Sequence, residues 1–181
     1  IETFNNIKKE KYSLSKLNQR YLNASLPNYE IINLNNTKME SQSWLSKKII
    51  DKVNLHLEKK DQVLFFLNRR GFSPYVLCKK CLKNYSCPNC SINLVYHKHK
   101  QNLLCHYCGY KTQLARNCNK DGMCDFVFSG PGVERISEEV KKKFPSKKTI
   151  IFSSDTMNKK SSSEILEKII NNEIQILVGT Q

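Results

Sequence analysis

Eight cysteines between positions 78 and 124 constrain what this chain can form more than any other feature. They fall into four pairs, three with the C-x-x-C spacing and one wider. A single C-x-x-C occurs in redox motifs as well as in metal sites, but four pairs in one short segment are typical of structural metal binding. The pairs are Cys78/Cys81, Cys87/Cys90, Cys105/Cys108 and Cys118/Cys124.

Disulfide bonds are the alternative use of so many thiols. Small secreted domains need them because their hydrophobic cores are too small. This chain has 181 residues and is 39% hydrophobic, which allows a core of its own. It shows no signal-peptide pattern, and its longest strongly apolar run, VLFFL at 63–67, is too short to span a bilayer. We therefore expect reduced thiols, a cytoplasmic location, no membrane contact and zinc as the cofactor.

The segment between Cys90 and Cys105 predicts which pairs share a metal ion. It reads SINLVYHKHKQNLL, which predicts two short strands around a polar turn. A hairpin between two cysteine pairs is a zinc ribbon, so the inner pairs form one site and the outer pairs form a second site that encloses it. The expected ligands are Cys87, Cys90, Cys105 and Cys108 for the inner zinc, and Cys78, Cys81, Cys118 and Cys124 for the outer zinc.

Histidines are possible additional ligands. His97 and His99 lie in the hairpin turn and His106 lies inside a cysteine pair. Solvent-facing polar residues are the favoured interpretation, with metal ligation as the alternative. His56 lies on a predicted helix, and we expect no special role for it.

The chain is strongly basic, with a formal charge of +14. Residues 78–124 contain seven lysines and Arg116 against one acid, Asp121. Two zinc ions, each with four thiolates, would lower the charge of the chain to about +10. A basic surface favours nucleic acid or another polyanion. Because only five of the 30 basic residues are arginine, a solvated lysine surface is the alternative.

Outside the cysteine segment, helical and strand patterns alternate. Ser43 is expected to cap a helix with apolar residues at steps of four, and QVLFFLN at 62–68 predicts a buried strand. The order favours an α/β fold with a parallel sheet and a zinc module inserted in one connection. Further expected elements are a strand at 29–34, a helix at 134–144, a strand at 149–152, a helix at 161–172 and a strand at 174–181.

Four residues are candidate nucleic-acid or nucleotide contacts at one sheet edge. Arg69 and Arg70 follow the VLFFL strand, and ligands of open α/β folds gather at the carboxyl ends of the strands. The two arginines either face phosphate there or are ordinary surface residues. Gly179 and Thr180 end the last strand at the same edge. The sequence contains no G-x-x-x-x-G-K-S/T loop, so we expect no catalytic residues and no ATP hydrolysis by this chain alone.

Four stretches together resemble the PriA family of primosomal replication-restart DNA helicases: VLFFLNRRGFSP, the cysteine array up to Cys108, GPGVER and ILVGTQ. The resemblance runs through nearly the whole chain. It implies that residues 1–40 are the end of a first helicase lobe and a connection. Residues 41–77 and 125–181 would form a second, RecA-like lobe, truncated at its C-terminus, around a zinc-binding module at 78–124. The first residue, Ile1, and the last strand ending at GTQ predict a piece of a longer protein.

The resemblance also implies a function. The family consists of ATP-driven 3′-to-5′ helicases that act at stalled forks and assemble the primosome, with ATP and magnesium as cofactors of the full-length protein. The implied partners are forked or single-stranded DNA, primosome proteins and single-stranded DNA-binding protein. The implied zinc pairing is the interleaved one, and the family places a motif that couples ATP to DNA at Gly179 and Thr180.

The chain departs from the family at two points. The family closes its outer zinc site with a fourth C-x-x-C, where this chain has Cys118-x5-Cys124, which puts the geometry of that site in question. The family's Gly-Thr-Glu is here Gly132-Val133-Glu134, which removes an expected helix cap. Two alternatives to a helicase fragment stay open, a stand-alone nucleic-acid-binding zinc ribbon and an interaction scaffold without motor activity.

Overall fold

The structure is a computed structural model, and it describes residues 1–18, 22, 24–40, 43–115, 117–118, 122–153 and 159–180. The chain divides into two compact units, residues 1–36 and 37–181. Arg116, Asp121 and Gln181, which entered the sequence predictions, lie outside the described residues. No helix within the described ranges is both long enough and apolar enough to cross a bilayer.

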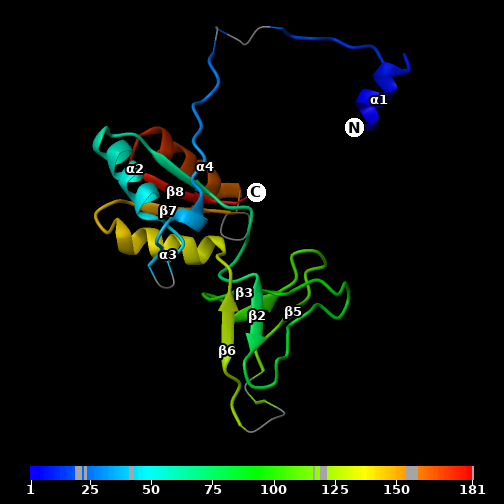
Figure 1. The fold of residues 1–181 in the computed structure, drawn as a ribbon, viewed down its shortest axis with the longest axis vertical. Coiled ribbons are helices and arrows are strands. Elements are labelled where there is room, and N and C mark those ends of the chain that lie inside the picture. Colours follow the sequence, from blue (N-terminus) through cyan, green and yellow to red (C-terminus); the bar gives the residue numbers. More distant parts are fainter. Residues whose placement is uncertain are drawn as a thin grey trace. The chain divides into compact units, whose positions relative to one another are not determined.

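The first unit contains a short helix, α1 (Glu2–Lys8), and a 3-10 turn, η2 (Leu34–Asn36) (Figure 1). The strand expected at 29–34 is wrong, because residues 29–33 have no regular secondary structure and Leu34 begins the 3-10 turn. Ile31 is 84% exposed, so the apolar residues of this stretch have no sheet face to pack on. A short apolar stretch does not make a strand when no partner strand lies beside it among the described residues.

The second unit is built on a three-stranded parallel sheet. β1 (Val63–Phe66), β8 (Ile176–Gly179) and β7 (Thr149–Phe152) pair in the order β1-β8-β7. Ile176 lies opposite both Val63 and Thr149. The expected α/β fold class with a parallel sheet is thereby confirmed.

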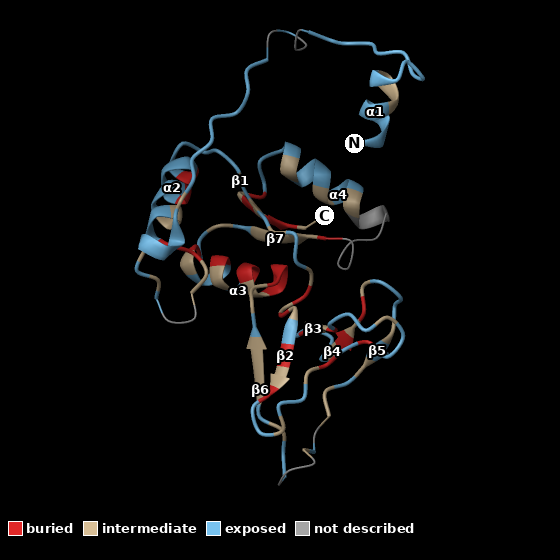
Figure 2. Cartoon of the chain, turned by 45° about the vertical axis from the view of Figure 1, so that its right-hand side comes forward, coloured by how far each residue is buried: buried red, intermediate tan, exposed pale blue. Residues whose placement is uncertain are grey.

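Helices cover both faces of this sheet. α2 (Lys47–Glu58) and α3 (Val133–Lys143) pack their apolar residues on one face, and α4 (Lys159–Ile170) lies on the opposite side of the sheet from α3 (Figure 2). The buried residues between α2, α3 and the sheet are Leu45, Val53, Leu57, Val133, Ile136, Val140, Phe144, Ile176 and Val178.

Two expectations about this unit are corrected. β1 is not a fully buried strand: it pairs only with β8 among the described residues, and Leu64 and Phe66 are about 60% exposed on the face away from this core. The cap of α2 is Ser46, whose side chain accepts a hydrogen bond from Ile49 N. Ser43 instead bonds to Glu139 of α3, so it ties two elements together rather than starting a helix.

The cysteine segment leaves and re-enters the lobe through two paired strands. β2 (Tyr75–Cys78) and β6 (Phe126–Ser129) are antiparallel, with Cys78 opposite Phe126. Beyond them lies a second sheet in the order β3 (Val95–His97), β4 (Asn102–Leu104) and β5 (Lys111–Thr112), which contains the expected hairpin. The module has a small core of its own, formed by Val76, Tyr85, Cys87, Leu94, Leu103 and Cys105.

Two backbone loops cross at the point where the module joins the lobe. The amides of Val133 and Glu134 donate to the carbonyls of Arg69 and Gly71, both at 2.9 Å, and Gly132 N donates to Phe72 O at 3.0 Å. These carbonyls satisfy the first amides of α3, which has no side-chain cap at Gly132. The loss of the expected cap is therefore compensated by a loop that is distant in sequence.

Gly132→Ala should test this crossing. A Cβ at position 132 would overlap the carbonyl oxygen of Gly71 and lie 2.9 Å from the carbonyl oxygen of Arg70, so backbone must move. We expect a loss of about 1–3 kcal/mol in the free energy of unfolding, measured by urea denaturation in the presence of zinc. Gly179→Ala is the control, because its Cβ would come no closer than 3.4 Å to other atoms. Equal losses for both variants would contradict the steric argument.

Candidate metal centres and nucleic-acid edge

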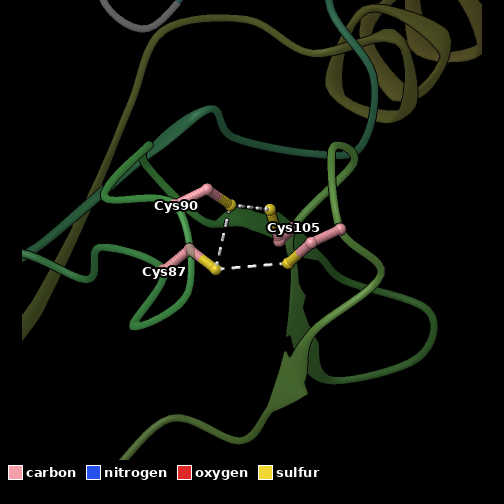
Figure 3. A group of neighbouring side chains, drawn as sticks. Cys87, Cys90 and Cys105 are labelled. Carbon is pink, nitrogen blue, oxygen red and sulfur yellow. Dashed lines mark hydrogen bonds between the residues drawn. The ribbon is translucent and has the colours of Figure 1, made fainter.

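The inner cysteine cluster lies between the turn that precedes β3 and the turn that follows β4. The Sγ atoms of Cys87 and Cys90 are 3.4 Å apart, those of Cys90 and Cys105 3.4 Å, and those of Cys87 and Cys108 3.5 Å (Figure 3). All four sulfurs lie within 4.8 Å of one another. A tetrahedral zinc with Zn–S bonds of about 2.3 Å needs sulfurs about 3.8 Å apart, so this donor set fits zinc.

The first three cysteine pairs share one turn geometry. In each turn, the residue four positions after the first cysteine donates its amide to that cysteine's carbonyl, at 2.8–2.9 Å. The same residue has positive φ, at 56° for Leu82, 57° for Ser91 and 79° for Gly109. This turn directs both thiols of a C-x-x-C to the same side, as a shared metal requires.

The outer cluster is less complete. Cys78, Cys81 and Cys118 have their sulfurs within 4.8 Å of one another, and the Cys78–Cys118 distance is 3.9 Å. Cys124 is not within that distance of all three, although it lines the same cavity as Cys81 and Cys118. The amide of the first cysteine differs as well, because Cys118 N donates to the carbonyl four positions later, Gly122 O, at 2.7 Å, whereas the first cysteines of the other pairs donate to the carbonyl five positions later. The wider spacing therefore alters the geometry at the fourth ligand.

The electrostatics of the thiols favour a bound cation. The backbone amide of Cys81 lowers the pKa of Cys78 to about 6, and the backbone amide of Cys108 lowers the pKa of Cys105 to about 6. Burial raises the pKa of Cys90, and burial together with Cys78 raises the pKa of Cys124 to about 11. In each cluster, some cysteines favour the ionised thiolate and another opposes ionisation. A bound dication would favour the thiolate form of all of them. All eight cysteines are free thiols, so none is used in a disulfide.

The histidine expectations are only partly correct. His99 and His56 are exposed, and His56 pairs with Asp61 at 2.8 Å. His97, expected to face solvent, is 2% exposed. Its Nδ1 lies 2.8 Å from Glu134 Oε1, and its Nε2 lies 3.0 Å from Nε2 of His106, which is half-buried. The strand period of two could have identified this burial, because it places His97 on the same face as Val95, which packs against Gly71.

The four candidate contact residues lie at or after the carboxyl ends of β1 and β8, which are adjacent strands. Phe66 and Gly179 lie opposite each other, and Leu67 N donates to Gly179 O at 2.9 Å. Thr180 follows directly, and its hydroxyl is buried with no hydrogen-bond partner among the described residues. Arg69 is exposed and Arg70 half-buried. Both arginines line a hollow of about 290 Å³ together with Asn68, Pro74, Val95 and His106.

Comparisons with known proteins agree with this architecture. The family model described as "PriA DNA helicase Cys-rich region (CRR) domain" matches residues 87–112, which contain the inner cysteine cluster. Over its whole length the chain is 42% identical to the replication restart protein PriA of Rickettsia felis. It is 37% identical to the protein of that name from Haemophilus influenzae and 30% identical to that from Bacillus subtilis, again over its whole length.

The chain belongs to the PriA family. It covers 28% of the Rickettsia felis protein, 25% of the Haemophilus influenzae protein and 23% of the Bacillus subtilis protein, so it spans about a quarter of the length of these relatives. The resemblance that the sequence motifs indicated is confirmed. The matched region places the zinc-ribbon part of PriA on the β3-β4-β5 sheet and the two turns beside it.

Serine substitutions separate the two clusters. We expect wild-type protein to retain two zinc ions and Cys105→Ser to lose the inner one, with loss of the β3-β4 hairpin. Cys78→Ser should lose only the outer ion, because its partners do not contribute to the inner cluster. Native mass spectrometry counts the ions. Ser86→Ala, an exposed neighbour of Cys87, is the control. Retention of two ions by both cysteine variants would contradict the pairing.

Proposed function

We propose that this chain is part of an ATP-dependent 3′-to-5′ DNA helicase that acts in replication restart and primosome assembly at stalled forks. Whole-length identity to proteins named replication restart protein PriA supports this assignment. In this proposal, residues 1–40 end the first helicase lobe and connect it to the second. Residues 41–77 and 125–181 form most of the second lobe, and residues 78–124 form the zinc module.

The observation that carries the proposal is the position of the zinc module at the sheet edge. β1 ends at Phe66, the chain passes Arg69 and Arg70, and β2 then leads directly into the cysteine segment. The return strand β6 leads into α3, whose first amides bind the carbonyls of Arg69 and Gly71. Ligands of parallel α/β sheets bind at this edge. A DNA strand held there would contact both the lobe and the module.

The zinc ions in this proposal are structural. The inner ion is held by Cys87, Cys90, Cys105 and Cys108, and the outer ion by Cys78, Cys81, Cys118 and Cys124. Each would stabilise a small core that holds few large apolar side chains. For the outer ion, Cys124 would move toward the other three sulfurs when the metal binds.

DNA would be held by its phosphates, through Arg69 and Arg70 in the hollow beside Pro74. Gly179 and Thr180 lie at the same edge, where the buried hydroxyl of Thr180 has no hydrogen-bond partner among the described residues and could bind a ligand. ATP and magnesium would be bound by other parts of the full-length protein, because these 181 residues contain no phosphate-binding loop. Forked or single-stranded DNA, primosome proteins and single-stranded DNA-binding protein are the proposed partners, in the cytoplasm.

A stand-alone zinc-ribbon DNA-binding function is the second candidate. The observation in its favour is that the module has its own buried core, separate from the core of the lobe. The two candidates differ in whether residues of the lobe edge contribute to DNA binding.

The first functional test concerns ATP. We expect the purified chain to show no ATPase activity above background, with or without single-stranded DNA, because nothing in it would hold the β- and γ-phosphates. A phosphate-release assay measures this, with a full-length PriA as the positive control. DNA-stimulated ATP hydrolysis by the chain alone would refute the proposal that ATP is bound by other parts of the full-length protein.

The second test concerns the lobe edge. Arg69→Gln should weaken binding to single-stranded DNA about 3- to 10-fold and lower the salt dependence by about 0.7 in log-log slope, because one phosphate contact is lost. Lys59→Gln is the control, since it removes an exposed charge after the end of α2, before β1 begins. Fluorescence anisotropy at several salt concentrations provides both values. Equal effects of the two substitutions would favour the stand-alone ribbon.

A further inference from the structure

Four side chains form a continuous row between the lobe and the inner cysteine cluster. Glu134 Oε1 lies 2.8 Å from His97 Nδ1, His97 Nε2 lies 3.0 Å from His106 Nε2, and His106 Nδ1 lies 3.5 Å from Arg70 Nη1. They come from α3, from β3, from the turn between Cys105 and Cys108, and from the loop after β1. The row thus begins and ends in the lobe and passes through the zinc ribbon.

The guanidinium of Arg70 and the carboxylate of Glu134, at the two ends of the row, determine which ring nitrogens of the two histidines carry protons. Arg70 can only donate, so Nδ1 of His106 must accept and its proton must lie on Nε2. Only one proton fits between the two Nε2 atoms, so Nε2 of His97 accepts. His97 then carries its proton on Nδ1 and donates it to Glu134. All three hydrogen bonds therefore point in one direction, from Arg70 toward the carboxylate.

The carboxylate end is held firmly. Glu134 is 7% exposed, and its second oxygen accepts from Lys98 N at 3.0 Å. Its own backbone amide is bound to Gly71 O in the loop crossing. Although burial opposes ionisation, the hydrogen bond from His97 keeps the pKa of Glu134 below its ordinary value. Glu134 is thus a fixed acceptor on which the row ends.

We propose that this row is a positioning relay, in which the inner zinc turn and Glu134 together set the position of the Arg70 guanidinium. The relay rests on the proposed inner zinc site, because His106 lies between the ligands Cys105 and Cys108. A metal that orders this turn also orders the His106 ring, and the ring in turn holds Arg70 beside the hollow at the sheet edge. His97 is a positioning residue, since it reaches Arg70 only through His106.

The proton arrangement provides the decisive test in the zinc-loaded chain. Two-bond ¹H–¹⁵N correlation spectra of the histidine rings distinguish the tautomers. We expect His97 as the Nδ1–H tautomer, which is the less common one in free histidine, and His106 as the Nε2–H tautomer. His99 serves as the exposed reference. Any other combination for His97 and His106 would overturn the relay.

Zinc content measured on the same sample distinguishes failure of the proposed inner zinc site from failure of the relay. A sample without inner zinc would overturn the metal dependence together with the zinc assignment. A sample with inner zinc but with other tautomers would overturn the relay alone.

The variants His97→Phe and His99→Phe test the positioning of Arg70. Phenylalanine keeps a ring at position 97 but removes both nitrogens, so His106 loses its acceptor. We expect the Nε–Hε signal of Arg70 to shift in His97→Phe and to stay in place in His99→Phe. An unmoved Arg70 signal in folded His97→Phe would show that the row does not position Arg70.

Arg70→Met, with Arg69→Met as its neighbour control, provides the reciprocal measurement if His97→Phe does not fold. Methionine removes the donor at the end of the row, and Arg70 is only half-buried, so the fold should survive. The ring signals of both His106 and His97 should shift in Arg70→Met and not in Arg69→Met. A change confined to His106 would contradict a relay that extends to His97.

Discussion

The structure of the second unit depends on the hydrogen bonds between the loop after β1 and the first amides of α3. Val133 and Glu134 donate to carbonyls more than sixty residues earlier in the sequence, and no side chain lies between the crossing backbones at Gly132. This crossing closes the zinc module at its base and starts the helix that covers the sheet. It also delivers Glu134 to the buried face of the β3 strand. The fold and the candidate site therefore depend on the same loop crossing.

Metal and packing have complementary parts in the module. Its core contains only a few large side chains, of which Leu94 and Leu103 are fully buried, and two of its buried residues are the cysteines Cys87 and Cys105. Small cores of this kind are marginal without a metal or a crosslink. The backbone amides that favour thiolates at Cys78 and Cys105 are part of the same turns that orient the sulfurs. The folded turns thus present ligands that are partly ionised in advance.

The sequence predicted what depends on local spacing. Strand and helix order and the hairpin follow from neighbouring residues, and the inner cysteines that group together are at most 21 positions apart. The hydrogen bond between the buried His97 and Glu134 was not predicted, because the two residues are 37 positions apart. Ser43 has the residue type of a helix cap but contacts Glu139 instead, and only the folded packing of α3 distinguishes it from Ser46. Cys124 lies outside the outer group of three sulfurs, and its spacing from Cys118 is wider than the C-x-x-C of the other pairs.

The pairing of β2 with β6 has a consequence for how the chain folds. Because Tyr75 lies opposite Ser129, the whole insertion is a closed loop once these strands meet. The entropic cost of bringing β1 to α3 then depends on the few residues between β1 and β2 and between β6 and α3, and no longer on the length of the full insertion. If the zinc ribbon folds first around its metal, the strands of the parallel sheet would pair faster. Zinc would then accelerate the folding of a lobe that supplies none of its proposed ligands.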